Sequence, residues 1–159
     1  MNIAPNAPHD IRREFVSLLP RLRRFALTLA ADLEEADELV RAACVEAIIE
    51  DRCPSGEKCM DPWLFALVRK AATDPARNQR TTKPEKPSAP HGSSATGQQA
   101  LILAMPEGQA CVFLLVEVEG FSYAQAADIL GISIELLASR LCDARMSFAA
   151  TAPTAERRA

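Results

Sequence analysis

A stretch rich in proline and hydroxyl side chains divides the 159-residue chain into two parts. Between residues 81 and 96 it carries three prolines, one glycine and a run of serine and threonine, with no apolar periodicity. This composition is typical of a flexible linker. Both flanking parts show apolar residues at helical spacing, and neither shows a convincing strand pattern. The sequence therefore predicts an all-α protein of two small helical domains, 10–80 and 99–150, with a linker at 81–98 and a flexible tail at 151–159.

Three helices are predicted in the first part, which would form a small bundle. The first carries an apolar face made of Phe15, Leu18, Leu19, Leu22, Phe25, Ala26 and Leu29. Three basic residues flank that face, and we interpret Arg21, Arg23 and Arg24 as a solvated surface.

Asp32 is placed to cap the second helix. The apolar stripe of this helix consists of Ala36, Leu39, Val40, Ala43, Cys44, Ala47 and Ile48. Asp61 and Pro62 open the third helix, since proline is favoured at the first helical position. Pro75 should end or kink that helix, because an interior proline removes an amide donor. Its inward residues are Trp63, Leu64, Leu67, Val68, Ala71 and Ala72.

Helix start and stop signals are regular in the second part. Pro106 opens a helix that Gly120 closes. Ser122, with Gln125 three residues later, forms a capping box before a short apolar helix. These signals predict two consecutive helices separated by a tight turn.

A glycine and a serine then separate this short helix from a last one. Gly131 ends the short helix, and Ser133 caps a helix that runs to about residue 149. A helix, a three-residue turn beginning with glycine, and a second helix form the pattern of a helix-turn-helix. The predicted core side of the last helix carries Ile134, Leu137, Leu141 and Ala144. The predicted outward face carries Glu135, Leu136, Ser139, Cys142, Asp143 and Met146.

Composition narrows the possible functions. The net charge of -3 means that nucleic-acid binding would need a local basic patch. No stretch approaches the roughly 20 uninterrupted apolar residues of a membrane span, so a cytoplasmic protein is expected. The five cysteines include no Cys-x-x-Cys pair. We predict no metal site, no cofactor and no enzymatic activity, since nucleophile–base pairs and phosphate-binding glycine loops are missing as well.

At its helix-turn-helix, the sequence resembles the extracytoplasmic-function (group 4) sigma factors of bacterial RNA polymerase. The stretch from Leu114 to Ser133, LLVEVEGFSYAQAADILGIS, is similar to sigma domain 4 almost position by position. Residues 36–40, ADELV, resemble the polymerase-binding helix of sigma domain 2, and Trp63, Leu64 and Phe65 resemble its promoter-melting segment. The resemblance covers roughly residues 10–149.

The resemblance implies a factor that binds core RNA polymerase and promoter DNA and is held inactive by an anti-sigma factor. Domain 2 would meet the -10 element and domain 4 the -35 element. The implied polymerase-binding residues are Asp37, Glu38, Leu39 and Arg41. The implied DNA-binding residues are Arg69, Lys70, Arg77, Arg80, Ser133, Glu135, Leu136, Ser139, Arg140 and Arg145.

Charge leaves two hypotheses open. From residue 105 to the end there are four basic and seven acidic residues, and the outward face of the last helix carries no cation. Family members usually place Thr and Lys at the positions of Leu136 and Ala138, and often Arg at Asp143. The first hypothesis is an alternative sigma factor that initiates promoter-specific transcription. The second is a degenerate, sigma-like decoy that binds an anti-sigma factor or polymerase without reading promoter DNA.

Overall fold

The computed structural model describes residues 11–50, 60–78 and 97–151, and within these ranges it is helical without strands. The all-α, two-domain fold class is therefore confirmed. The elements are α1 (Ile11–Leu27), α2 (Leu33–Glu50), α3 (Met60–Thr73), α4 (Pro75–Asn78), α5 (Gly97–Leu103), α6 (Glu107–Phe113), the π-helical segment η1 (Leu114–Val118), α7 (Tyr123–Leu130) and α8 (Ile134–Thr151).

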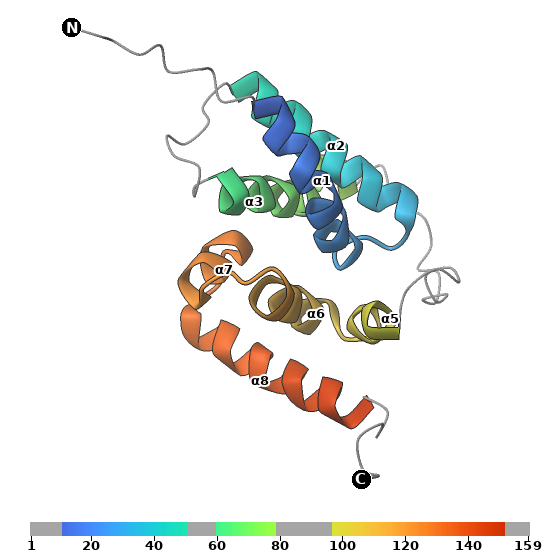
Figure 1. Cartoon of the computed structure of the whole chain (residues 1–159), viewed down its shortest axis with the longest axis vertical. Helices are drawn as coiled ribbons and strands as arrows, with labels where there is room; N and C mark the ends of the chain where they lie inside the picture. The colour runs from blue at the N-terminus through green and yellow to red at the C-terminus, as the bar shows by residue number, and fades with distance from the viewer. Residues whose placement is uncertain (1–10, 51–59, 79–96, 152–159) are drawn as a thin grey trace, which may run out of the picture.

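Helices α1, α2 and α3 pack against one another as the apolar spacing predicts (Figure 1). Asp32 caps α2, since its Oδ1 accepts a hydrogen bond of 2.8 Å from the amide of Glu35. α3 ends at Thr73, and α4 begins at Pro75, so the proline interrupts the helix as expected. The fully buried side chains of this bundle include Leu22, Phe25, Leu39, Leu64 and Phe65.

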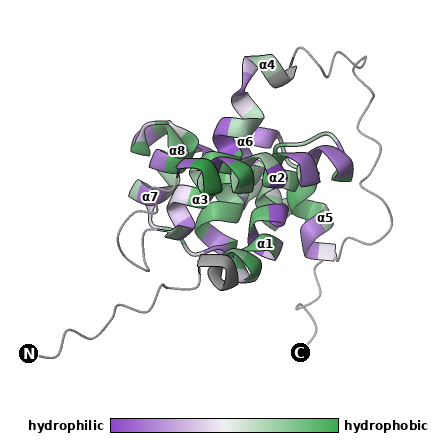
Figure 2. Cartoon of the chain, turned by 90° about the horizontal axis from the view of Figure 1, so that it is seen from above, coloured by the Kyte–Doolittle hydropathy of each residue, from purple (hydrophilic) through white to green (hydrophobic). Residues whose placement is uncertain are grey.

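Two residues assigned to the core faces of these helices are exposed instead. Leu19 of α1 is 38% exposed, and Ile48 of α2 is 71% exposed. The core side of α2 is narrow because small residues, Ala36, Ala43 and Ala47, let the neighbouring helices approach closely. Ile48 lies outside this narrow stripe, so its prediction as a core residue was wrong. Hydrophobic and hydrophilic residues are mixed on the surface of the helices (Figure 2).

The helix-turn-helix forms as its capping residues predict. Ser122 Oγ accepts from the amide of Gln125 at 3.2 Å, and Gln125 Oε1 accepts from the amide of Ser122 at 3.1 Å. Gly131 takes the left-handed conformation that favours glycine, with φ +63°. Ser133 Oγ accepts from the amide of Leu136 at 3.2 Å and thereby caps α8.

α8 buries Leu137, Leu141 and Ala144 against the rest of the second domain, as predicted. Ile134 was also expected on the core side, but it is 49% exposed because it lies in the first turn, beyond the edge of the packed surface. Helix α5 was not predicted, and it begins at Gly97, inside the segment assigned to the linker. The rest of that linker, and the tail after Thr151, lie outside the described residues.

The two domains pack directly on each other. α3 of the first domain contacts α7 of the second, and the buried residues of both domains belong to one contiguous core (Figure 1). α8 lies on the far side of α6 and α7, so it faces away from the first domain.

Candidate functional site

The outward face of α8, where DNA contacts were expected, is open to solvent. Glu135, Leu136 and Ser139 are exposed there, together with Asp143 and Met146. Ser133 is exposed as well, but its hydroxyl is used as the cap of α8. Because base edges and phosphates are read mainly by donors and cations, this acidic and apolar face can contribute little electrostatic attraction to DNA.

The two arginines of α8 are oriented toward the protein itself. Arg145 Nε donates to Glu117 Oε1 at 2.9 Å, and this hydrogen bond raises the pKa of Arg145 above its usual range. Arg140 lies against α6, since a Cβ added to Gly108 would meet the guanidinium carbon at 3.3 Å. A glycine at this position therefore leaves room for the flat side chain. Both cations flank the outward face rather than lying on it.

The basic residues expected on the promoter-melting segment are divided among different environments. Arg69 of α3 donates to Glu107 of α6 at 3.3 Å, which is a contact between the two domains. Lys70 forms an ion pair with Glu46 of α2, and this hydrogen bond raises the pKa of Lys70. Arg77 lies in α4, and Arg80 lies outside the described residues. No continuous basic stripe is formed by Arg69 and Lys70.

The residues expected to bind polymerase lie in the first half of α2. Asp37 pairs with Arg23 at 2.7 Å, and Glu38 pairs with Arg41 on the same helix. Leu39 was assigned to polymerase contact, but it is only 1% exposed and packs in the core. Its apolar character is therefore explained by packing.

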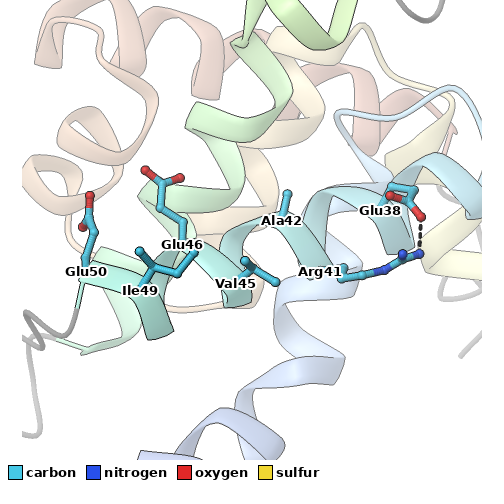
Figure 3. A pocket seen from close by; sticks show the side chains of 7 residues that line it. All are labelled: Glu38, Arg41, Ala42, Val45, Glu46, Ile49 and Glu50. Carbon is cyan, nitrogen blue, oxygen red and sulfur yellow. Dashed lines mark hydrogen bonds and ion pairs between the residues drawn. The ribbon is translucent and has the colours of Figure 1, made fainter.

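A shallow groove runs along the exposed side of α2 (Figure 3). Val45 and Ile49 form its apolar floor, with 49% and 75% of their surface exposed. Charged side chains surround this floor, and Glu46 and Glu50 lie at its C-terminal end. An exposed apolar strip with a charged rim is typical of a protein-binding surface. The complete lining is Glu38, Arg41, Ala42, Val45, Glu46, Ile49 and Glu50.

At the domain contact, a carboxylate of the second domain meets two arginines of the first. Glu119 is almost completely buried, with 1% of its side chain exposed. Its Oε2 accepts from Arg21 Nε at 2.6 Å, and its Oε1 accepts from Arg24 Nη2 at 2.9 Å. Arg21 also donates to Asp61 Oδ2 at 2.5 Å. Burial acts to lower the pKa of Arg21, but the hydrogen bonds to Glu119 and Asp61 outweigh it and raise that pKa.

Segment η1 brings Glu119 into this position. The amide of Glu119 donates to the carbonyl of Leu114, five residues earlier, at 2.9 Å. A π-helical turn accommodates an extra residue and rotates the chain that follows. Gly120 then adopts φ +76°, which places Phe121 against the first domain. The irregular end of this helix thus positions Glu119 and Phe121 at the domain contact.

No group of residues suited to a metal ion occurs within the described ranges. Among the described helices, none is long and apolar enough to cross a membrane.

Comparison with known families identifies both domains. Residues 99–147 match the family model for sigma-70, region 4, and residues 15–69 match the model for the Sigma2 domain of PhyR. A curated relative, the ECF RNA polymerase sigma factor EcfG of Rhodopseudomonas palustris, is 28% identical over 153 residues, covering 89% of this chain and 84% of the relative. Over both domains and in their order, the chain is similar to the extracytoplasmic-function sigma factors.

Two solved structures share this sigma-factor fold. One is the sigma factor RpoE in complex with the anti-sigma factor NepR from Bartonella quintana, with a TM-score of 0.70, 22% identity and coverage of 87% of this chain and 93% of that one. The other is the anti-anti-sigma factor PhyR complexed with NepR, also from Bartonella quintana, with a TM-score of 0.54, 19% identity and coverage of 89% and 51%. Both similarities extend over the two domains together.

These comparisons confirm the main functional prediction, an alternative sigma factor, and do not favour the degenerate decoy. Sequence reasoning missed two features of this sigma factor. Arg21 and Arg24 were interpreted as a solvated surface, although they pair with Glu119 across the domain contact. The groove over Val45 and Ile49 was missed because these two residues were assigned neither to the core nor to a binding surface. A signal for it existed, since Val45, Ile48 and Ile49 widen the apolar face of α2 beyond one core stripe.

Proposed function

We propose that this sigma factor binds core RNA polymerase through the exposed face of α2 and directs it to promoters through α3 and the helix-turn-helix. The observation that carries the proposal is the simultaneous exposure of the α2 groove and of the outward face of α8. These surfaces belong to different domains, as a factor that contacts polymerase and two promoter elements requires.

The polymerase contact is assigned to the apolar floor of the groove, with charged residues at its rim. Val45 and Ile49 supply apolar area, while Glu38 and Arg41 line the N-terminal end. Asp37 lies one residue before this rim and is half exposed. Apolar area surrounded by charge gives both affinity and orientation. Leu39 supports the helix from behind.

Promoter contacts are assigned to both domains. In the first domain, Arg69, Lys70, Arg77 and Arg80 would follow the DNA backbone near the -10 element. In the second domain, residues of α8 would meet the -35 element, and these are Ser133, Glu135, Leu136, Ser139, Arg140 and Arg145. Since Arg145 and Arg140 contact the protein, the second domain is expected to add little affinity by itself.

An anti-sigma factor of the NepR kind is proposed as the inhibitor, because the similarity to the RpoE of that complex covers both domains. The sigma factor itself would act as a transcription regulator rather than as an enzyme. It would work in the cytoplasm, where RNA polymerase is found.

In vitro transcription tests the proposal. Core polymerase with the purified protein should initiate at a defined set of sites on genomic DNA, read by sequencing the RNA 5′ ends. Initiation should fall when the candidate anti-sigma factor is added. Binding to core polymerase without initiation at any promoter would support the decoy instead.

A matched pair of substitutions tests the groove. Ile49→Glu should weaken binding to core polymerase at least about tenfold, because burying an unpaired carboxylate is unfavourable. Leu33→Glu is the control, since Leu33 lies on the same helix, is 48% exposed and does not line the groove. Equal binding by both variants in a pull-down titration would refute the assignment.

A further inference from the structure

The two domains are joined by a specific polar contact rather than by apolar packing alone. Both oxygens of Glu119 are used, one by Arg21 and the other by Arg24, and these arginines lie 98 and 95 residues away in the sequence. We propose that these three residues form a latch that holds the sigma factor in a closed, promoter-incompetent state until polymerase binds. The consequence for transcription depends on the function proposed above.

Aromatic side chains surround the latch. Phe121 of the second domain meets Phe65 of α3 edge-on, with ring centroids 5.0 Å apart, and Phe65 in turn lies 5.3 Å from Phe25. The guanidinium of Arg21 lies 5.7 Å from the Phe65 ring and 6.0 Å from the Phe121 ring. These rings cover the Arg21 side of the latch, whereas the Arg24 side chain is 46% exposed. The latch is therefore a partly buried contact with defined geometry.

A second contact joins the turn after α1 to α6. Thr28 donates its hydroxyl proton to the carbonyl of Phe25 at 2.7 Å, so Cys111 is the donor in the 3.3 Å contact between Sγ and Thr28 Oγ1. Cys111 is 2% exposed, and burial raises the pKa of its thiol to about 11. The Cys111 thiol is consequently protected from alkylating reagents as long as the two domains stay together.

The closed arrangement is too small to reach both promoter elements. The -10 and -35 elements are named for positions 25 base pairs apart, which corresponds to about 85 Å at 3.4 Å per base pair. A compact chain of this length has a radius of gyration of about 15 Å, so it spans much less than that distance. Closure also ties Arg69, a proposed promoter contact, to Glu107. Promoter binding by both domains therefore requires the latch to open.

The proposed polymerase surface does not need this opening. The groove over Val45 and Ile49 lies on α2 and is exposed in the closed state (Figure 3). The closed factor would therefore contact polymerase first, through α2. The second domain is then released, with residues 79–96 long enough to extend over about 60 Å.

Alkylation of Cys111 measures opening without polymerase or DNA. Its rate in the native protein should be slow and should rise about tenfold in Glu119→Gln, because charge-assisted hydrogen bonds contribute to closure. Arg24→Gln should act in the same direction. Arg23→Gln is the matched control, since Arg23 is similarly exposed but pairs with Asp37 inside the first domain. Mass spectrometry of the peptide that carries Cys111 gives the rate.

A reversible crosslink tests the consequence. In Thr28→Cys the new thiol faces Cys111, so oxidation by diamide should join residues 28 and 111 within one chain, whereas the parent protein should form no such bond. The oxidised variant should still bind core polymerase but lose transcription, and dithiothreitol should restore it.

Three results would overturn the latch. They are fast alkylation of Cys111 in the native protein, equal rates for Arg24→Gln and Arg23→Gln, and unimpaired transcription by the crosslinked variant. None of these depends on which promoter is used. If the native protein initiates at no promoter, the proposed function fails, while the alkylation rates still decide whether the latch exists.

Discussion

Adding cations to α8 is expected to convert a weak DNA contact into a measurable one. The variant carries Ala138→Lys and Asp143→Arg, two exposed positions that raise the local charge by three units. Both lie on a helix that faces away from the first domain, so they are accessible in the closed state (Figure 1). The change tests whether missing cations, rather than a distorted helix-turn-helix, limit affinity.

The expected magnitude follows from counterion release. Each phosphate neutralised adds about 0.9 to the slope of log affinity against log salt concentration, so two new contacts add about 1.8. Between 200 and 50 mM salt, a fourfold dilution, the variant should gain roughly 12-fold more affinity than the native protein. Fluorescence anisotropy with labelled duplexes at several salt concentrations measures this slope.

The control carries the same charge change at a different place. Ala31→Lys with Glu34→Arg adds three units of charge at two exposed positions near the start of α2. Its salt slope should stay close to that of the native protein. If both variants gain equally, the effect is one of overall charge. If neither gains, α8 does not approach DNA, and the assignment of its outward face is refuted.

Two further predictions concern stability. Gly131→Ala should lower the free energy of unfolding by about 1–2 kcal/mol in a thermal or urea melt, because Gly131 has φ +63° and nothing lies near its Cβ position, so only backbone strain is added. Gly97→Ala, with open space and no positive φ, should not destabilise the protein. Cys111 should contribute stability that is fully present below its ordinary pKa of 9.0 and is lost as the pH rises to about 11, since the folded state favours the neutral thiol. Urea melts across this range should show up to about 2–3 kcal/mol of loss, and Cys111→Ala should remove that component.

Local signals explain why the helix-turn-helix could be predicted from sequence. A capping box at Ser122, a left-handed Gly131 and a capping Ser133 each act within three residues, so their structural effects are visible in one short stretch. Helix α5 was missed for the opposite reason. It has seven residues and no capping signal, and its stability comes from packing on α6 and α8.

Long-range contacts account for the remaining differences. The pairing of Arg21 with Glu119 depends on a π-helical turn that shows no periodicity signal of its own, and on two domains meeting in a particular orientation. In the candidate site, residue type alone could place Leu39 and Arg41 on the same helix. The apolar spacing put Leu39 on the inner face of that helix, and its assignment to polymerase came from the family resemblance, which marks a helix rather than the side chains that face a partner.

The acidic residues of the second domain, which account for the net charge of -3, fall into two groups with different effects. Glu107 and Glu119 face the first domain and pair with its arginines, so they favour closure. Asp128, Glu135 and Asp143 are exposed and oppose an approach to DNA. A weak -35 contact is compatible with promoter selection when polymerase holds the factor beside the duplex, because tethering supplies an effective concentration in the millimolar range. The same acids therefore make the free protein a poor DNA binder and leave promoter recognition dependent on assembly with polymerase.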